Sequence, residues 1–331
     1  MHLIFLLLIF CKLKIHNSSL GDSDPRYRKC IELCYKQECV DLLQIDICSE
    51  DCEYKCMMNI TYSKRKGNIP VVKYYGHWPF VRIFGFQEPA SALFSAMNCL
   101  PHIYNTLFRR YRFWKPQYPM SNFIILHSII SVFTWAASTL YHYHRTELSE
   151  RVDLCSAFLF ISFSTWVAMY NLISLQDRHF IFQISSAIFY FTLVLFQIFR
   201  IWNRTCTFTE HVHLSIFLVI CHSTLWMLWA FLSDAPWSLK KHCITLQICL
   251  LAAGLFEIFD FPPIYDILDA HAVWHAATIP IGFSWYNFWS EHSKLYDRVS
   301  TSCALSERSL LREVSAGGDG YKSSESFRKS D

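Results

Sequence analysis

Charged residues are scarce in this sequence. Only 17% of its 331 residues are Asp, Glu, Lys or Arg, whereas soluble domains average about 25%. The 30 Lys and Arg residues form no stripe that could follow a phosphate backbone, which argues against nucleic acid as a partner. Hydrophobic residues, in contrast, make up 53% of the chain. Together these features predict an integral membrane protein.

The N-terminus has no A-x-A cleavage site, but its composition is typical of a secretory signal peptide. An apolar run from Leu3 to Phe10 precedes Lys12, Lys14 and a polar segment. We predict a signal peptide over residues 1–20, with an uncleaved short anchor as the alternative. A signal peptide would deliver the segment that follows to the lumen of the secretory pathway.

Six of the 14 cysteines gather in that next segment, residues 21–70. They are Cys30, Cys34, Cys39, Cys48, Cys52 and Cys56. Closely spaced thiols can bind zinc, but an upstream signal peptide favours disulfides. The pairing cannot be deduced from the sequence, because six cysteines allow many combinations.

Seven further segments are candidates for membrane spans, each of which needs about 20 mainly apolar residues. They lie near 90–108, 122–142, 153–173, 180–200, 212–232, 243–260 and 270–289. The expected fold is therefore all-α, a seven-transmembrane helix bundle over residues 90–289. An aromatic connector over 71–89 is expected at the membrane interface. The polar residues 290–331 are expected to form a disordered cytosolic tail, because they lack apolar periodicity.

Loop charge agrees with this topology. If the cysteine segment is lumenal, the loop after the first span, with Arg109 and Arg110, and the loop after the fifth, with Lys240, both face the cytosol. That is the positive-inside pattern. The same topology places the glycosylation motifs at Asn59 and Asn203 in the lumen, so a glycoprotein is expected.

Ionisable residues inside membrane spans usually mark function, and five chemistry-bearing residues are predicted to meet at the lumenal side. Ser138 and His142 are four residues apart near the end of the second span, and Asp153 begins the third. His271 and His275, also four apart, begin the seventh span. Residues at this spacing lie on one face of a helix, so two imidazoles can bind one metal ion.

Three histidines with an open fourth position are typical of catalytic zinc. His142, His271 and His275 are therefore the predicted metal ligands, Asp153 the residue that orients water or accepts its proton, and Ser138 a donor to the oxyanion. Histidine pairs in spans also serve as simple contacts between helices. Four carboxylates near the seventh span could either orient the histidines or act as ordinary caps. They are Glu257, Asp260, Asp266 and Asp269.

Several motifs, in order, resemble the post-GPI-attachment-to-proteins phospholipase (Per1-like) family. They are Tyr75-Gly-His-Trp-Pro-Phe-Val-Arg82, Gln87-Glu-Pro-Ala-Ser-Ala-Leu-Phe-Ser95, Ser138-Thr-Leu-Tyr-His142, Asp260-Phe-Pro-Pro263 and Asp269-Ala-His-Ala-Val-Trp-His275. The resemblance spans roughly residues 25–290 and extends to the CREST superfamily of seven-span hydrolases. The chain departs from the pattern around Tyr143-His-Arg145 and at Leu154, which leaves its substrate preference open.

The resemblance implies a GPI-anchor lipid-remodelling hydrolase of the Golgi or endoplasmic reticulum membrane. It would remove the unsaturated sn-2 acyl chain from protein-attached GPI, with Ser138, His142, Asp153, His271 and His275 as functional residues and zinc as cofactor. GPI-anchored proteins would be its partners. The alternatives are a ceramidase-like hydrolase, a non-catalytic escort or receptor for GPI-anchored proteins, and a serine hydrolase without metal, although three histidines exceed what a triad needs.

Overall fold

The structure is a computed structural model that describes residues 19–39, 45–115, 117–175 and 180–325, with side chains at all of these except 45–47 and 298–325. Within this part of the chain the regular elements are helices, accompanied by three isolated β-bridges. The predicted signal peptide lies almost entirely outside the described residues.

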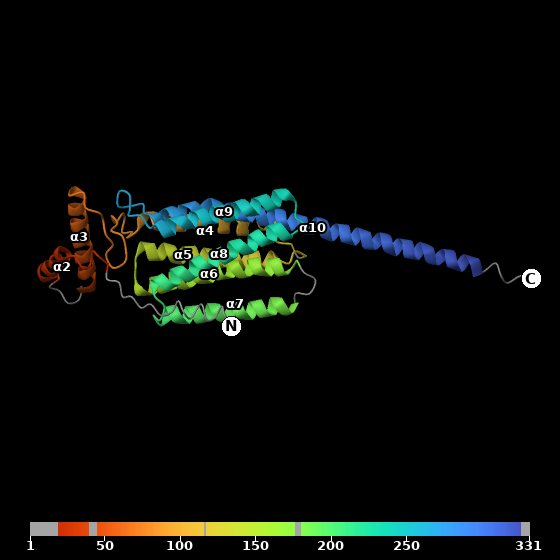
Figure 1. Cartoon of the computed structure of the whole chain (residues 1–331), viewed down its shortest axis with the longest axis horizontal. Helices are drawn as coiled ribbons and strands as arrows, with labels where there is room; N and C mark the ends of the chain where they lie inside the picture. The colour runs from red at the N-terminus through yellow and green to blue at the C-terminus, as the bar shows by residue number, and fades with distance from the viewer. Residues whose placement is uncertain (1–18, 40–44, 116, 176–179, 326–331) are drawn as a thin grey trace, which may run out of the picture.

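Among the described residues, seven long helices form one bundle and two more stand at one end of it (Figure 1). The end helices are α2 (Pro25–Glu38) and α3 (Ile45–Lys66). The bundle consists of α4 (Pro89–Phe108), α5 (Ser121–Tyr143), α6 (Glu147–Ile173), α7 (Phe180–Trp202), α8 (Phe208–Leu232), α9 (Trp237–Phe259) and α10 (Ala270–Glu325), with a short 3-10 helix, η3 (Arg110–Arg112), after α4. We call the end of the bundle next to α2 and α3 the α2–α3 end.

Two of the bundle helices, α6 and α8, begin at reciprocal caps. Thr146 and Ser149 exchange side-chain and backbone hydrogen bonds at the start of α6, and Thr207 and Glu210 do so at the start of α8. These reciprocal contacts satisfy amide groups that have no partner inside the helix. Both caps lie at the α2–α3 end, so the sequence sets where the chain turns back into the bundle.

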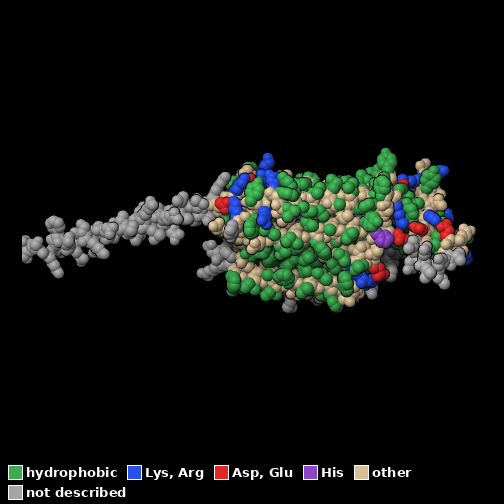
Figure 2. Space-filling view, turned by 180° about the vertical axis from the view of Figure 1, so that it is seen from behind, with side chains coloured by type: hydrophobic (Ala, Val, Ile, Leu, Met, Phe, Trp, Pro, Cys, Tyr) green, Lys and Arg blue, Asp and Glu red, His purple; other side chains and the backbone are tan. Residues whose placement is uncertain are grey.

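The surface of the bundle is that of a membrane protein. Five helices, α5 to α9, are long and apolar enough to cross a bilayer among the described residues. Figure 2 shows a broad belt of hydrophobic side chains between two ends that carry the charged ones. The chain is therefore a multi-pass membrane protein, and the prediction of an all-helical fold is confirmed.

The predicted count of seven spans is confirmed only in part, because α4 and α10 are not among the five. Polar residues interrupt the apolar run of α4, and they point into the bundle. Ser91, Ser95, Asn98 and His102 are all buried. Such a helix packs through its polar face against its neighbours α5 and α10, which keeps these groups away from lipid.

Three disulfides join α2 to α3, and the prediction of an oxidised segment is confirmed. The pairs are Cys30–Cys56, Cys34–Cys52 and Cys39–Cys48. Their nested order ties two antiparallel helices together along their length. Tyr27 and Tyr74 complete a small core beside the Cys30–Cys56 bond. Cross-links of this kind stabilise a segment too small for a large hydrophobic core.

The residues expected to form a disordered tail continue α10 as a helix to Glu325, and this helix projects beyond the far end of the bundle (Figure 1). No proline interrupts residues 290–325. A helix already formed inside the bundle extends without a new nucleation step.

Candidate metal centre

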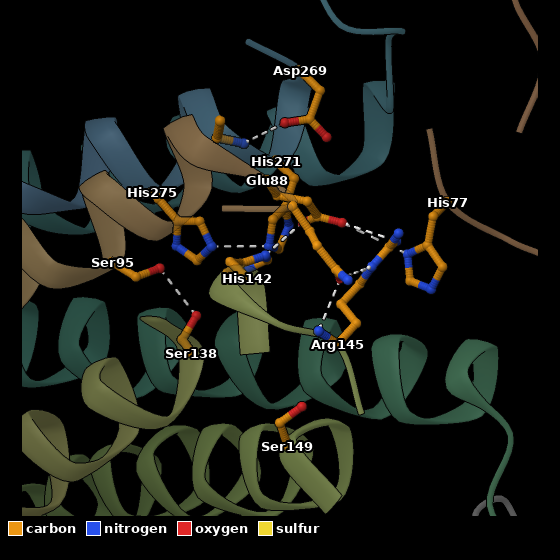
Figure 3. A network of polar contacts seen from close by, with 12 residues as sticks. His77, Glu88, Ser95, Ser138, His142, Arg145, Ser149, Asp269, His271 and His275 are labelled. Carbon is orange, nitrogen blue, oxygen red and sulfur yellow. Dashed lines mark hydrogen bonds and ion pairs between the residues drawn. The ribbon is translucent and has the colours of Figure 1, made fainter. Parts of the chain in front are cut away.

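Three histidines meet at the α2–α3 end of the bundle. His142 lies in the last turn of α5, and His271 and His275 lie in the first two turns of α10. Each offers a ring nitrogen within 4.8 Å of those of the other two. Figure 3 shows the three rings side by side. The structure thus brings the three predicted metal ligands together, although they come from helices far apart in the chain.

In two of these rings a carboxylate determines which nitrogen faces the other histidines. The Nδ1 atom of His142 lies 2.6 Å from Oε2 of Glu88, and that of His271 lies 2.7 Å from Oε2 of Glu257. A carboxylate accepts a hydrogen bond, so each Nδ1 carries the proton and each Nε2 is left with a lone pair. This is the arrangement found behind metal-bound histidines.

The Nε2 atoms of the three histidines point toward one another and find little else to bind. Among the described residues, Nε2 of His142 is buried and has no hydrogen-bond partner. Nε2 of His271 and Nε2 of His275 lie 2.9 Å apart, where two lone pairs would repel unless a cation or a proton lay between them. An unpaired buried acceptor is costly. The donor set therefore fits a metal ion that prefers imidazole, such as zinc.

Glu88 was not predicted as a site residue, although the motif that contains it was recognised. It precedes Pro89, which begins α4, and its backbone N–H donates to the carbonyl of His142 over 3.0 Å. Arg145 Nη1 donates to its other carboxylate oxygen over 3.2 Å. Burial alone would raise the pKa of Glu88, but His142 and Arg145 outweigh it and hold the pKa below its ordinary value. Glu88 is therefore an ionised acceptor for His142.

Of the four carboxylates considered at the sequence level, only Glu257 contacts a site histidine through its side chain. Asp269 accepts a hydrogen bond from the Ala272 N–H and caps α10. Asp260 binds Trp78 and Lys73, and Asp266 binds Arg65. Asp260 and Asp266 thus fasten the loop between α9 and α10 to the aromatic connector and to α3, respectively. They position the start of α10 and, with it, His271.

Ser138 and Asp153 also lie at this end of the bundle. Ser138 is buried one turn before His142, and its Oγ lies 3.1 Å from Oγ of Ser95 on α4 (Figure 3). Asp153 lies two turns into α6, within electrostatic reach of His142 and His271. Its carboxylate has no hydrogen bond or ion pair within the described chain, so it is available to a water molecule. Ser95 was missed because one serine in an apolar helix carries no signal by itself.

Replacing Glu88 by Gln should weaken metal binding without removing a ligand. The amide can still contact Nδ1 of His142, but it no longer offers a charged acceptor that favours the required tautomer. Loss of such a partner typically lowers metal affinity about 10- to 100-fold. Competition with a chelator on purified protein measures this. Glu291→Gln, on an exposed site of α10, is the control, and equal affinities for both variants would contradict the role of Glu88.

Fold and site together define a class: a multi-pass helical membrane protein with a three-histidine centre at one end of its bundle. The model of the Per1-like family matches residues 39–293, so the chain belongs to the Per1-like family. The resemblance recognised in the sequence is thereby confirmed.

Similar proteins cover nearly the same region. The GPI-specific phospholipase A2-like PGAP3 of Xenopus laevis is 30% identical over 84% of this chain and 91% of its own length. The protein of the same name from Danio rerio is 29% identical over 82% and 90%. The post-GPI attachment to proteins factor 3 of Drosophila melanogaster is 28% identical over 82% of each chain. No solved structure shows a significant match.

Proposed function

We propose that this protein is a membrane phospholipase that removes the sn-2 acyl chain from protein-attached GPI, using zinc. The observation that carries the proposal is the three-histidine cluster with Glu88 and Glu257 behind two of its rings. Simple helix contacts would not require three imidazoles to converge, two of them with a carboxylate behind the ring at Nδ1. The relatives named GPI-specific phospholipase A2-like support the choice of substrate.

The place of the site suits an ester near a lipid headgroup. The histidines lie at the ends of α5 and α10, next to the disulfide-linked helices. In a lipid the ester bonds lie between the acyl chains and the headgroup, which is the depth of helix ends in a bilayer. We therefore infer seven spans, with this end and the disulfides in the lumen of the Golgi or endoplasmic reticulum and the C-terminus in the cytosol. The sequons at Asn59 and Asn203 then face the lumen as well.

Each residue of the site has a separate role in ester hydrolysis. A zinc ion held by His142, His271 and His275 would supply Lewis-acid polarisation and lower the pKa of a water molecule. Asp153 accepts the proton as water adds to the ester carbonyl, and the hydroxyl of Ser138 donates to the oxygen that gains negative charge. Asp153 then returns the proton to the departing glycerol oxygen as the C–O bond breaks. The products are a free fatty acid and lyso-GPI.

The contacts of Ser138 favour this mechanism over a serine hydrolase. Its hydroxyl pairs with Ser95, and no hydrogen bond joins it to a histidine in the described part of the chain. A serine nucleophile needs a neighbouring base. His142, the nearest candidate along α5, presents one nitrogen to Glu88 and the other to the histidine cluster.

The test is hydrolysis by the purified full-length protein in nanodiscs, supplied with GPI labelled in either the sn-1 or the sn-2 chain. We expect release of the sn-2 fatty acid alone, and loss of release after chelation that zinc restores. Release from ceramide in a parallel assay would instead identify a ceramidase. If no lipid is cleaved, but the protein restores GPI-anchored protein export in cells that lack it, the escort hypothesis replaces this one.

A further inference from the structure

A polar cavity of about 450 Å³ lies between the disulfide-linked helices and the α2–α3 end of the bundle. Its wall on one side includes Tyr54 of α3 and Tyr75 of the connector, and on the other side Tyr141 of α5, Arg145, and Glu150 of α6. Small-molecule sites typically enclose about 300 to 1,000 Å³. The cavity is thus large enough for a ligand of one or two rings, and neither the metal centre nor the disulfides account for it.

One layer of side chains separates this cavity from the metal centre. Gln87 and Arg145 line the cavity, and Arg145 donates to Gln87 Oε1 through its backbone N–H over 2.9 Å and through Nε over 3.2 Å. The same guanidinium donates to Glu88, which holds His142. His77, also in the wall, lies 4.0 Å from Glu88. A molecule in the cavity therefore lies one layer of side chains away from the histidines.

The wall combines three kinds of recognition. A guanidinium has five N–H donors, and Nη2 of Arg145 has no acceptor among the described residues, so it is available to an anion. The carboxylate of Glu150 has no hydrogen bond or ion pair in the same part of the chain, so it is available to an amine or hydroxyl group. The tyrosines add flat apolar faces with hydroxyl groups at their edges. A site for a simple anion would not include a free carboxylate such as that of Glu150.

We propose that this cavity binds the polar headgroup of the substrate, specifically the inositol phosphate and the amino sugar attached to it; this rests on the proposed function. In GPI the phosphate between inositol and glycerol is only a few covalent bonds from the sn-2 ester. When that ester lies at the histidines, the phosphate must lie close by, and Arg145 is the cation at that boundary. Glu150 suits the amine of the sugar, and Tyr75 suits a ring face.

The test measures binding without turnover, by isothermal titration calorimetry of the full-length protein in nanodiscs. The probe is lipid-free glucosaminyl-inositol phosphate, with inorganic phosphate as the comparison. We expect the probe to bind wild type and the His271→Ala variant equally. Arg145→Gln should bind at least about tenfold more weakly, because a charged hydrogen bond is lost.

Two tyrosine variants keep the test decisive if Arg145→Gln does not fold. Tyr75→Ala removes a cavity ring but keeps the backbone N–H that donates to Asp22, and it should weaken binding. Tyr62→Ala removes a similarly exposed ring of α3 outside the cavity wall and should bind as wild type does. The proposal is overturned if the probe does not bind wild type, if Tyr75→Ala binds it equally well, or if inorganic phosphate binds as tightly. Binding of the probe without hydrolysis of GPI would retain the cavity assignment and reject the hydrolase.

Discussion

Replacing His271 by Ala should abolish both zinc retention and lyso-GPI formation. The substitution removes one of three imidazoles and leaves Glu257, whose contact with Nδ1 of His271 is 2.7 Å, as a carboxylate without its partner. Two histidines do not complete the ligand set of a catalytic zinc site. The measurement is mass spectrometry of GPI anchors from cells lacking this protein, complemented with wild type or with the variant, together with metal analysis of both purified proteins. Wild type should retain about one zinc per chain.

His213→Ala is the matched control, because His213 is an exposed histidine of α8 near the same end of the bundle. It should retain both metal and activity. If His271→Ala remodels anchors as well as wild type does, the proposed site is wrong. If it loses activity but keeps a full complement of zinc, the metal lies elsewhere in the chain.

Replacing Asp153 by Asn should abolish most activity while leaving the metal in place. Asp153 is not among the three residues proposed to bind the metal. Its carboxylate lies within electrostatic reach of His142 and His271 and has no hydrogen bond or ion pair among the described residues. An amide of the same shape cannot accept the proton from water. A positioned general base contributes about 100-fold or more to rate, so we expect a loss of at least this size in sn-2 fatty acid release.

This variant separates the hydrolase from the escort hypothesis. An escort that uses zinc only for structure would function normally with Asn at position 153. Asp234→Asn, at the loop between α8 and α9 at the far end of the bundle, is the control for substituting one acidic residue. Loss of zinc from Asp153→Asn would show that Asp153 supports metal binding and does not act in proton transfer.

The disulfides were predictable from the sequence only in part. The six cysteines and the signal-like N-terminus predict oxidation, but not the nested pairing. That pairing depends on how α2 lies against α3, and the sequence does not specify the distance between two Cβ atoms. The tail shows a different limit, because a polar composition does not exclude a helix that continues from the bundle.

The candidate metal centre was also predictable only in part. His271 and His275 were predictable as a pair, because their spacing alone puts them on one face of α10. Addition of His142 and Asp153 required only a topology with alternating spans. Glu88 required more, since it lies 54 residues before His142, and no local pattern links the start of α4 to the end of α5. The contact between Ser95 and Ser138 depends on the same packing, and so does the polar cavity.

The sequence by itself determined the membrane class, most of the helices, the histidine pair and the family. Each of these depends on local composition or on short spacing, because a helix in lipid satisfies its own backbone and needs only a sufficiently long apolar run. The tertiary structure alone decided which carboxylate stands behind each histidine, which cysteines join, and where the cavity lies. These features depend on contacts between residues far apart in the chain, and such contacts form only when the helices pack.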